Sequence, residues 1–154
     1  LQDNATPAGA SMFARDLVRL EAYTGAGVYG EAAQRALALL ASALREAPQA
    51  FGEALNALVG VVLGVSEVAI VGAPSDAATR ALLDLVQKPY RPDVITALAP
   101  ASVAAVHESI PLLDYRVTRG AAPTAYVCQR FVCQMPVTAP DALAGLLPAS
   151  ITIA

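Results

Sequence analysis

The chain has 154 residues, of which 56% are hydrophobic and 15% are charged, and its formal net charge at pH 7 is −3. This length suits one domain or a domain with a small satellite, and the charged share lies below the roughly 25% of an average protein. The basic residues are scattered, so we expect no nucleic-acid partner. The longest strongly apolar run, 57–65, is too short to cross a membrane, and residues 1–11 do not resemble a secretory signal, so we expect a cytoplasmic protein.

The first 66 residues are predicted to form three amphipathic helices. In the first helix, Phe13, Leu17 and Leu20 recur at three- and four-residue spacing, with Ala14 and Val18 on the adjacent row, which predicts one apolar stripe. Gly25 suits a left-handed C-terminal cap. Pro48 stops the second helix and can start the third. The expected helices cover about residues 11–24, 29–47 and 48–63. Three such helices with short turns are typical of a helical hairpin array.

The pattern changes at Glu67, where short apolar runs rich in β-branched residues begin. Runs of this kind, bounded by turn residues, predict buried strands. A helix that Ser75 or Asp76 caps is expected between the first two strands, so a parallel crossover is predicted. The expected strands are 67–71, 93–98 and 124–128. The predicted fold is therefore α+β and mostly helical, with a helical region at 1–66 and, at 67–154, a small α/β unit with a three-stranded, mainly parallel sheet.

Two further features have plain structural explanations. The turn Gly72-Ala-Pro-Ser-Asp76 stands where many α/β folds bind phosphate, but it lacks the glycine-rich and lysine-containing motifs. We expect an ordinary turn with a helix-capping residue. His107 is predicted to lie in a short helix at 101–109 as a surface or half-buried side chain. The sequence therefore predicts no cofactor site.

The two cysteines, Cys128 and Cys133, are separated by four residues and leave several possibilities open. A turn between them would bring them close enough for a disulfide or redox pair. On one continuous strand, an offset of five would place them on opposite faces. Free cysteine also packs as a small buried hydrophobe, which favours structural, reduced thiols. A metal site would need further ligands, and His107 is the only additional candidate of the Cys or His type, so no metal is expected.

Two segments carry a resemblance to a known family. They are Ala125-Tyr-Val-Cys-Gln-Arg-Phe-Val-Cys-Gln-Met-Pro-Val-Thr138 and the opening Asp3-Asn-Ala-Thr-Pro-Ala-Gly-Ala-Ser11. The first resembles the C-terminal signature of a family of thioredoxin-domain-containing proteins, which includes the spermatogenesis-associated thioredoxin-like proteins and bacterial homologues. The second resembles that family's D-N-A-x-P-S-G-N-S segment, with Ala8 and Ala10 in place of Ser and Asn. The resemblance extends from Asp3 to about Leu147.

The resemblance implies a longer parent protein. Its members carry an N-terminal thioredoxin-like domain followed by an α/α toroid similar to N-acylglucosamine epimerases and six-hairpin glycosidases. The 154 residues here hold no Cys-x-x-Cys motif and too few helices to close a toroid, so we expect a C-terminal fragment or a shortened relative. Asp3 and Asn4 would then lie near a toroid mouth and are weak catalytic candidates, with catalysis mostly outside this chain.

The expected partner is the rest of the parent protein or a second copy of the chain. Three helices cut from a ring would leave apolar flanks uncovered, which favours a homo-oligomer. The residues expected near such a contact are Phe13, Leu17, Phe51 and Leu55. The alternative function is a non-enzymatic module that associates with itself or with a partner.

Overall fold

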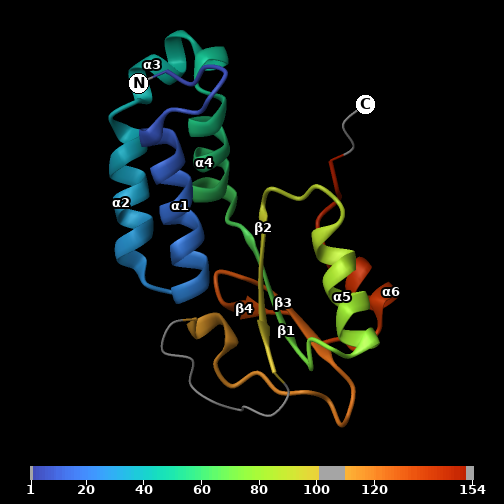
Figure 1. Ribbon diagram of the computed structural model, residues 1–154. Helices are drawn as coiled ribbons and strands as arrows, with labels where there is room; N and C mark the ends of the chain where they lie inside the picture. The colour runs from blue at the N-terminus through green and yellow to red at the C-terminus, as the bar shows by residue number, and fades with distance from the viewer. Residues whose placement is uncertain (1, 101–109, 152–154) are drawn as a thin grey trace. The chain divides into compact units, whose positions relative to one another are not determined.

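The computed structural model describes residues 2–100 and 110–151, and Figure 1 shows the path of the chain. The contacts divide the chain into two compact units, Leu1–Val65 and Ser66–Ala154. The first unit is helical and the second combines a mixed sheet with helices, so the predicted mostly helical α+β class is confirmed. The helix expected at 101–109, with His107, lies outside the described residues.

The helical unit is built around α1, which packs against both α2 and α4 (Figure 1). Gly25 ends α1 with a φ of 69°, the left-handed cap that its sequence predicted. Small side chains such as Ala14, Ala33 and Ala57 are almost fully buried and let the helix axes approach closely. The elements of this unit are α1 (Gly9–Thr24), α2 (Gly27–Ala38), α3 (Ala41–Glu46), the 3-10 turn η1 (Pro48–Ala50) and α4 (Gly52–Leu63).

Two details of the helical prediction are wrong. A turn at Leu39 and Leu40 interrupts the expected helix 29–47. In this turn Leu39 is exposed and Leu40 is buried in the core. The predicted apolar stripe of α1 is correct at Ala14, Leu17 and Val18 but wrong at Phe13 and Leu20, which are 60% and 42% exposed. The buried face of α1 consists of Ser11, Ala14, Leu17, Val18 and Ala22.

The α/β unit contains a sheet with the strand order β2-β1-β3-β4. Strand β1 (Ser66–Val71) pairs in parallel with β2 (Val94–Ala99), and the helix α5 (Ala77–Gln87) lies in the connection between the two strands, as predicted. Its other neighbour, β3 (Thr124–Gln129), runs antiparallel to it, and β4 (Val132–Cys133) runs antiparallel to β3. The prediction of a three-stranded, mainly parallel sheet is therefore wrong for the third strand. An apolar run indicates a buried strand but not its direction.

The two faces of this sheet have different surroundings. One face packs on α5 and α6 (Pro140–Ala144) through an apolar core that includes Val68, Ile70, Leu82, Val127 and Leu143. Because side chains alternate along a strand, Glu67, Ala69, Tyr126 and Cys128 belong to the opposite face. The 3-10 turn η2 (Pro111–Leu113) contacts β1 and β2 and buries Leu112 and Leu113. Glu67, Tyr126 and Cys128 therefore lie on the face away from α5.

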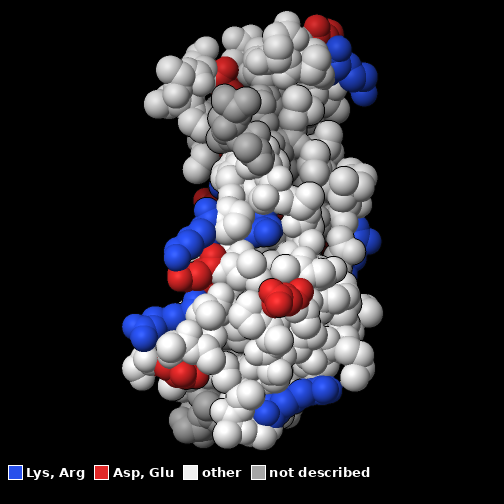
Figure 2. Space-filling model, turned by 90° about the vertical axis from the view of Figure 1, so that its right-hand side faces the viewer, with Lys and Arg blue, Asp and Glu red and all other residues white. Residues whose placement is uncertain are grey.

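The surface carries few charges. Figure 2 shows Lys, Arg, Asp and Glu side chains in small groups separated by uncharged surface. The described residues contain no group of three or more His, Cys, Asp and Glu that could hold a metal ion. Among the helices described, none combines the length and the apolar character needed to cross a membrane.

Candidate functional site

The candidate site begins with a tight hairpin between β3 and β4. Its two central residues, Arg130 and Phe131, have φ values of 50° and 62°. Two positive φ values in a two-residue loop define a type I′ turn, which matches the twist of the flanking strands. Asn-Gly and Asp-Gly are the usual residues at these positions, so the dipeptide Arg-Phe did not indicate a hairpin in the sequence.

The hairpin places the two cysteines directly opposite each other. Cys128 pairs with Cys133 across β3 and β4, and their sulfur atoms form a disulfide with Sγ–Sγ 2.03 Å. The Gln134 amide donates to the Val127 carbonyl at 2.9 Å, so the cysteines occupy the adjacent non-hydrogen-bonded pair, where side chains lie closest. Of the possibilities that the sequence left open, the structure has the disulfide. The argument from a continuous strand fails because the turn reverses the chain.

A guanidinium group lies beside the disulfide. The Nη2 atom of Arg116 is 3.0 Å from Sγ of Cys133 and 3.7 Å from Sγ of Cys128. The guanidinium carbon also lies 5.0 Å from the centre of the Tyr126 ring, within the range of a cation–π contact. The Nε atom of Arg116 donates to the Leu112 carbonyl at 3.4 Å. Arg116 forms no ion pair with a carboxylate in the described part of the chain.

Two further side chains hold this arrangement in place. The Tyr126 hydroxyl donates to the Val117 carbonyl at 2.7 Å and accepts from the Val117 amide at 3.3 Å, which fixes the segment that carries Arg116. Glu67 is buried, stands opposite Cys128 in the register of β1 and β3, and accepts a 2.9 Å hydrogen bond from the Phe131 amide. The disulfide is therefore surrounded by an arginine, a tyrosine and a glutamate from three different segments.

This arrangement has a definite chemical capacity. A disulfide is cleaved when a thiolate attacks one sulfur and the other sulfur leaves as a thiolate. A neighbouring Arg stabilises thiolates, because it keeps its positive charge and donates charge-assisted hydrogen bonds. Sequence reasoning found the two cysteines but missed Arg116, Tyr126 and Glu67. The only available signal was Glu67, a carboxylate at the start of a buried strand.

The weak catalytic candidates Asp3 and Asn4 are placed differently from the cysteines. Both carboxylate oxygens of Asp3 accept backbone hydrogen bonds, Oδ1 from Ala8 at 2.7 Å and Oδ2 from Glu53 and Ala54 at 2.8 and 3.2 Å. Burial raises the pKa of Asp3, but these hydrogen bonds outweigh it and the pKa is lowered. Asp3 thus caps the first turn of α4, while Asn4 is exposed.

The turn after β1 has the structural role that its sequence indicated. Asp76 caps α5 by accepting a 3.2 Å hydrogen bond from the Ala78 amide. Gly72 is required there for packing, since a Cβ atom would clash with Thr79 Oγ1 and lie 2.8 Å from Pro123 Cβ. A carboxylate therefore occupies the helix end at which a phosphate would bind.

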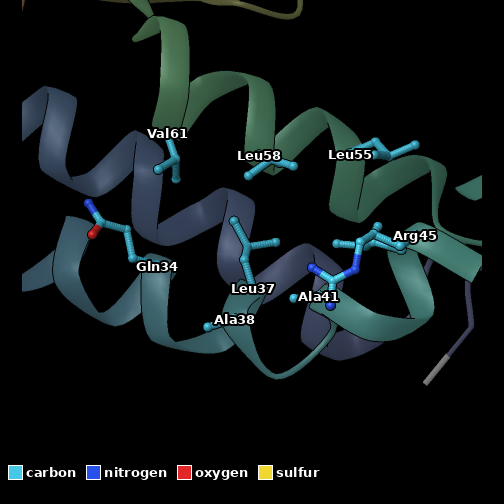
Figure 3. A pocket seen from close by; sticks show the side chains of 9 residues that line it. Gln34, Leu37, Ala38, Ala41, Arg45, Leu55, Leu58 and Val61 are labelled. Carbon is cyan, nitrogen blue, oxygen red and sulfur yellow. The ribbon is translucent and has the colours of Figure 1, made fainter.

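The helical unit contains a cavity of about 430 Å³ between α2, α3 and α4. Figure 3 shows Leu55, Leu58 and Val61 of α4 facing α2, with Gln34 at one end of the row and Arg45 at the other. The remaining lining is apolar and comes from Leu37, Ala38, Ala41 and Leu44. The cavity offers apolar contact area, and its only polar lining side chains are at the two ends.

Fold and site together define a chain of two units, in which a helical unit precedes an α/β unit with a disulfide hairpin. The chain is similar over 95% of its length to spermatogenesis-associated protein 20 from human, with 29% identity across 147 residues. The mouse and rat proteins of that name match the same share of the chain at 28% and 29% identity.

The chain spans about a fifth of those relatives, since the matched region covers 19% of each. No family model matches the chain, and no solved structure does.

Proposed function

We propose that the chain is the C-terminal portion of a longer, thioredoxin-linked, sugar-epimerase-like protein, whose catalysis resides mostly outside these residues. In this proposal the helical unit is part of an α/α toroid similar to those of six-hairpin glycosidases, and the parent protein is cytoplasmic. The similarity to relatives five times longer supports this interpretation. So does the structural use of Asp3, whose Oδ2 caps α4 and whose Oδ1 accepts from the Ala8 amide.

The observation that carries the proposal is the apolar character of α4 on more than one side. Ala54 and Ala57 are buried within the helical unit, where α4 contacts α1. A second stripe, at i, i+3, i+4 and i+7, consists of Leu55, Leu58, Val59 and Val62, and Val59 and Val62 are 49% and 63% exposed. A helix that is apolar on two sides is normally covered on both. In an α/α toroid the next helical hairpin would cover this second stripe.

The test compares one substitution in two contexts. We expect Val59→Glu with Val62→Glu to change the free energy of unfolding of the isolated chain by less than about 0.5 kcal/mol, because both sites are exposed there. In the full-length parent the same pair should destabilise the protein by several kcal/mol, because two carboxylates would be buried.

Gln49→Glu, at an exposed polar position of the same unit, is the matched control and should be neutral in both proteins. Denaturant unfolding measures each variant. Equal and small effects of the double substitution in both contexts would refute the proposal that the parent protein covers α4.

The same exposed stripe favours a second candidate, a module that associates with its own copy. A two-fold axis would let one apolar patch cover its equivalent. Phe13 is exposed and remains a candidate contact, and Leu55 lies at the cavity. Leu17 and Phe51, which were expected near this contact, are only 6% and 3% exposed, because the unit's own helices cover them.

Sedimentation equilibrium of the isolated chain over a hundredfold range of concentration tests self-association. A dimer that the Val59→Glu, Val62→Glu pair converts to a monomer supports the second candidate. A monomer at every concentration rejects it and leaves the parent protein as the partner of this surface.

A further inference from the structure

We propose that the Cys128–Cys133 disulfide is a thiol–disulfide exchange site that is reduced by a protein dithiol, with attack at Cys133 and with Arg116 stabilising the thiolates that form. Every group that the proposal uses lies within the α/β unit.

Burial decides which sulfur is attacked. Cys128 is 3% exposed, because it lies in β3 between β1 and β4. Cys133 is partly exposed, in a two-residue strand at the edge of the sheet. An incoming thiolate therefore has better access to Cys133 than to the buried Cys128. Exchange rates depend on this access.

Arg116 provides the chemical reason for exchange rather than a purely structural disulfide. Its Nη2 atom reaches both sulfurs, at 3.0 and 3.7 Å, and it forms no ion pair with a carboxylate of the described residues. The Leu112 carbonyl and the Tyr126 ring hold the guanidinium in place. A cation that is already positioned gains a charge-assisted hydrogen bond when a sulfur becomes a thiolate. The reduced state and the transition state that leads to it are both stabilised in this way.

Exchange takes place in two displacement steps. One thiol of the partner dithiol loses its proton to water, and its thiolate attacks Cys133 Sγ. The Cys128–Cys133 S–S bond breaks, and its electron pair leaves on Cys128 Sγ. The partner's second thiol, also deprotonated, attacks the partner sulfur of the mixed disulfide and releases Cys133 as a thiolate. The partner becomes a disulfide, and two electrons pass to this chain. The two thiolates take up two protons, or keep a negative charge beside Arg116.

The surface around Cys133 fits a protein partner rather than a small charged thiol. Phe131 and Met135, each two residues from Cys133 in the sequence, are 36% and 73% exposed, so exposed apolar side chains lie on both sides of the attacked residue along the chain. Apolar side chains grouped at an exposed position are typical of protein contacts. A dithiol also resolves its own mixed disulfide, which a monothiol cannot do.

The first experiment measures the reduction rate by dithiothreitol in native buffer, followed by alkylation and intact mass, as a function of pH. We expect Arg116→Gln to slow reduction by about tenfold at pH 7, because one charge-assisted hydrogen bond to the leaving sulfur is lost. Arg116→Lys should restore part of the rate, since it restores the charge. Arg119→Gln removes an equal charge from an exposed position three residues away and should reduce like the natural protein.

The pH profile separates charge stabilisation from a merely structural role. After reduction, alkylation of the more reactive cysteine should reach half its maximal rate at a lower pH in the natural protein than in Arg116→Gln. Identical profiles and reduction rates in the two folded proteins would overturn the role of Arg116. If Arg116→Gln does not fold, the alkylation profile of the reduced natural protein is the test. A pH dependence like that of an ordinary cysteine would then refute the proposal.

The second experiment identifies the attacked sulfur. Each single-cysteine variant is first converted to its mixed disulfide with thionitrobenzoate, which a thioredoxin-type protein with its resolving cysteine replaced can then displace as the leaving thiolate. Cys128→Ser should form a stable mixed disulfide with that protein through Cys133. Cys133→Ser should trap far less on the buried Cys128. Equal trapping on both, or a natural disulfide that dithiothreitol reduces only in denaturant, would overturn the proposal.

Discussion

The carboxylate of Glu67 accepts a 2.9 Å hydrogen bond from the backbone amide of Phe131, which lies 64 residues further along the chain. This bond joins the start of β1 to the turn between β3 and β4. Phe131 has a φ of 62°, a conformation that costs a non-glycine residue about 1–2 kcal/mol. The surrounding structure therefore has to hold the turn in place, and Glu67 is one of the groups that does so.

Replacing Glu67 by Ala should loosen the hairpin. Without the carboxylate, the Phe131 amide loses its acceptor, so its hydrogen exchange should quicken by at least about tenfold. The Gln134 amide, which bonds to the Val127 carbonyl, is the internal control and should change less. Native-state exchange followed by mass spectrometry measures both. Unchanged protection at Phe131 would mean that the turn does not depend on Glu67.

A second prediction concerns the backbone of the turn itself. Phe131→Gly should stabilise the α/β unit by about 0.5–1 kcal/mol, because glycine adopts positive φ without the steric cost, partly offset by its greater unfolded-state entropy. Val132→Gly, one residue later in the extended strand β4, should destabilise the unit instead. Denaturant unfolding of both variants provides the measurement. A destabilising Phe131→Gly would show that contacts of the Phe131 ring outweigh the backbone strain.

The core of the α/β unit provides a third prediction. Ile70 is fully buried in β1, in the apolar cluster between the sheet and α5. Ile70→Ala should lower the free energy of unfolding by about 2–5 kcal/mol through lost transfer energy and a residual cavity. Met135→Ala, at a site that is 73% exposed, should cost less than about 0.5 kcal/mol. Denaturant unfolding measures both variants, and a loss below about 0.5 kcal/mol for Ile70→Ala would contradict the place of Ile70 in the core.

The fourth prediction concerns Asp3 and the pH dependence of the helical unit. Asn offers one acceptor oxygen where Asp3 uses two, so Asp3→Asn must leave the Ala8 amide or the α4 amides unpaired. We expect a loss of about 1 kcal/mol at pH 7, the usual value of a helix cap. Asp16→Asn, at an exposed position of α1, is the control.

The sign of the pH effect follows from the lowered pKa of Asp3. Because the folded state binds the proton more weakly than the unfolded state, the Asp3 contribution is fully present above the unfolded pKa. It is lost as the pH falls through the lower, folded value. The stability difference between the natural chain and Asp3→Asn should therefore shrink in acid. A difference that is independent of pH between neutrality and acid would show that the Asp3 charge does not support the cap.

Local pattern was enough to determine much of this protein from its sequence. The helical character of the first unit, the β1–α5–β2 crossover, the Gly25 cap and the Asp76 cap were all predicted. Each depends on residues a few positions apart, so periodicity and capping chemistry suffice to identify it. The apolar run of β3 likewise predicted a buried strand, because its composition shows burial whatever its partner is.

Only the tertiary structure decided the rest. The direction of β3 depends on its neighbour β1, and an apolar strand pairs equally well either way. The disulfide depends on a turn at Arg130 and Phe131, whose side chains do not favour positive φ and which distant contacts hold in place. Arg116 reaches the sulfurs from a loop that no local signal connects to them, and Asp3 caps a helix fifty residues away. Such contacts arise when the whole fold brings distant segments together, and no short-range pattern records them.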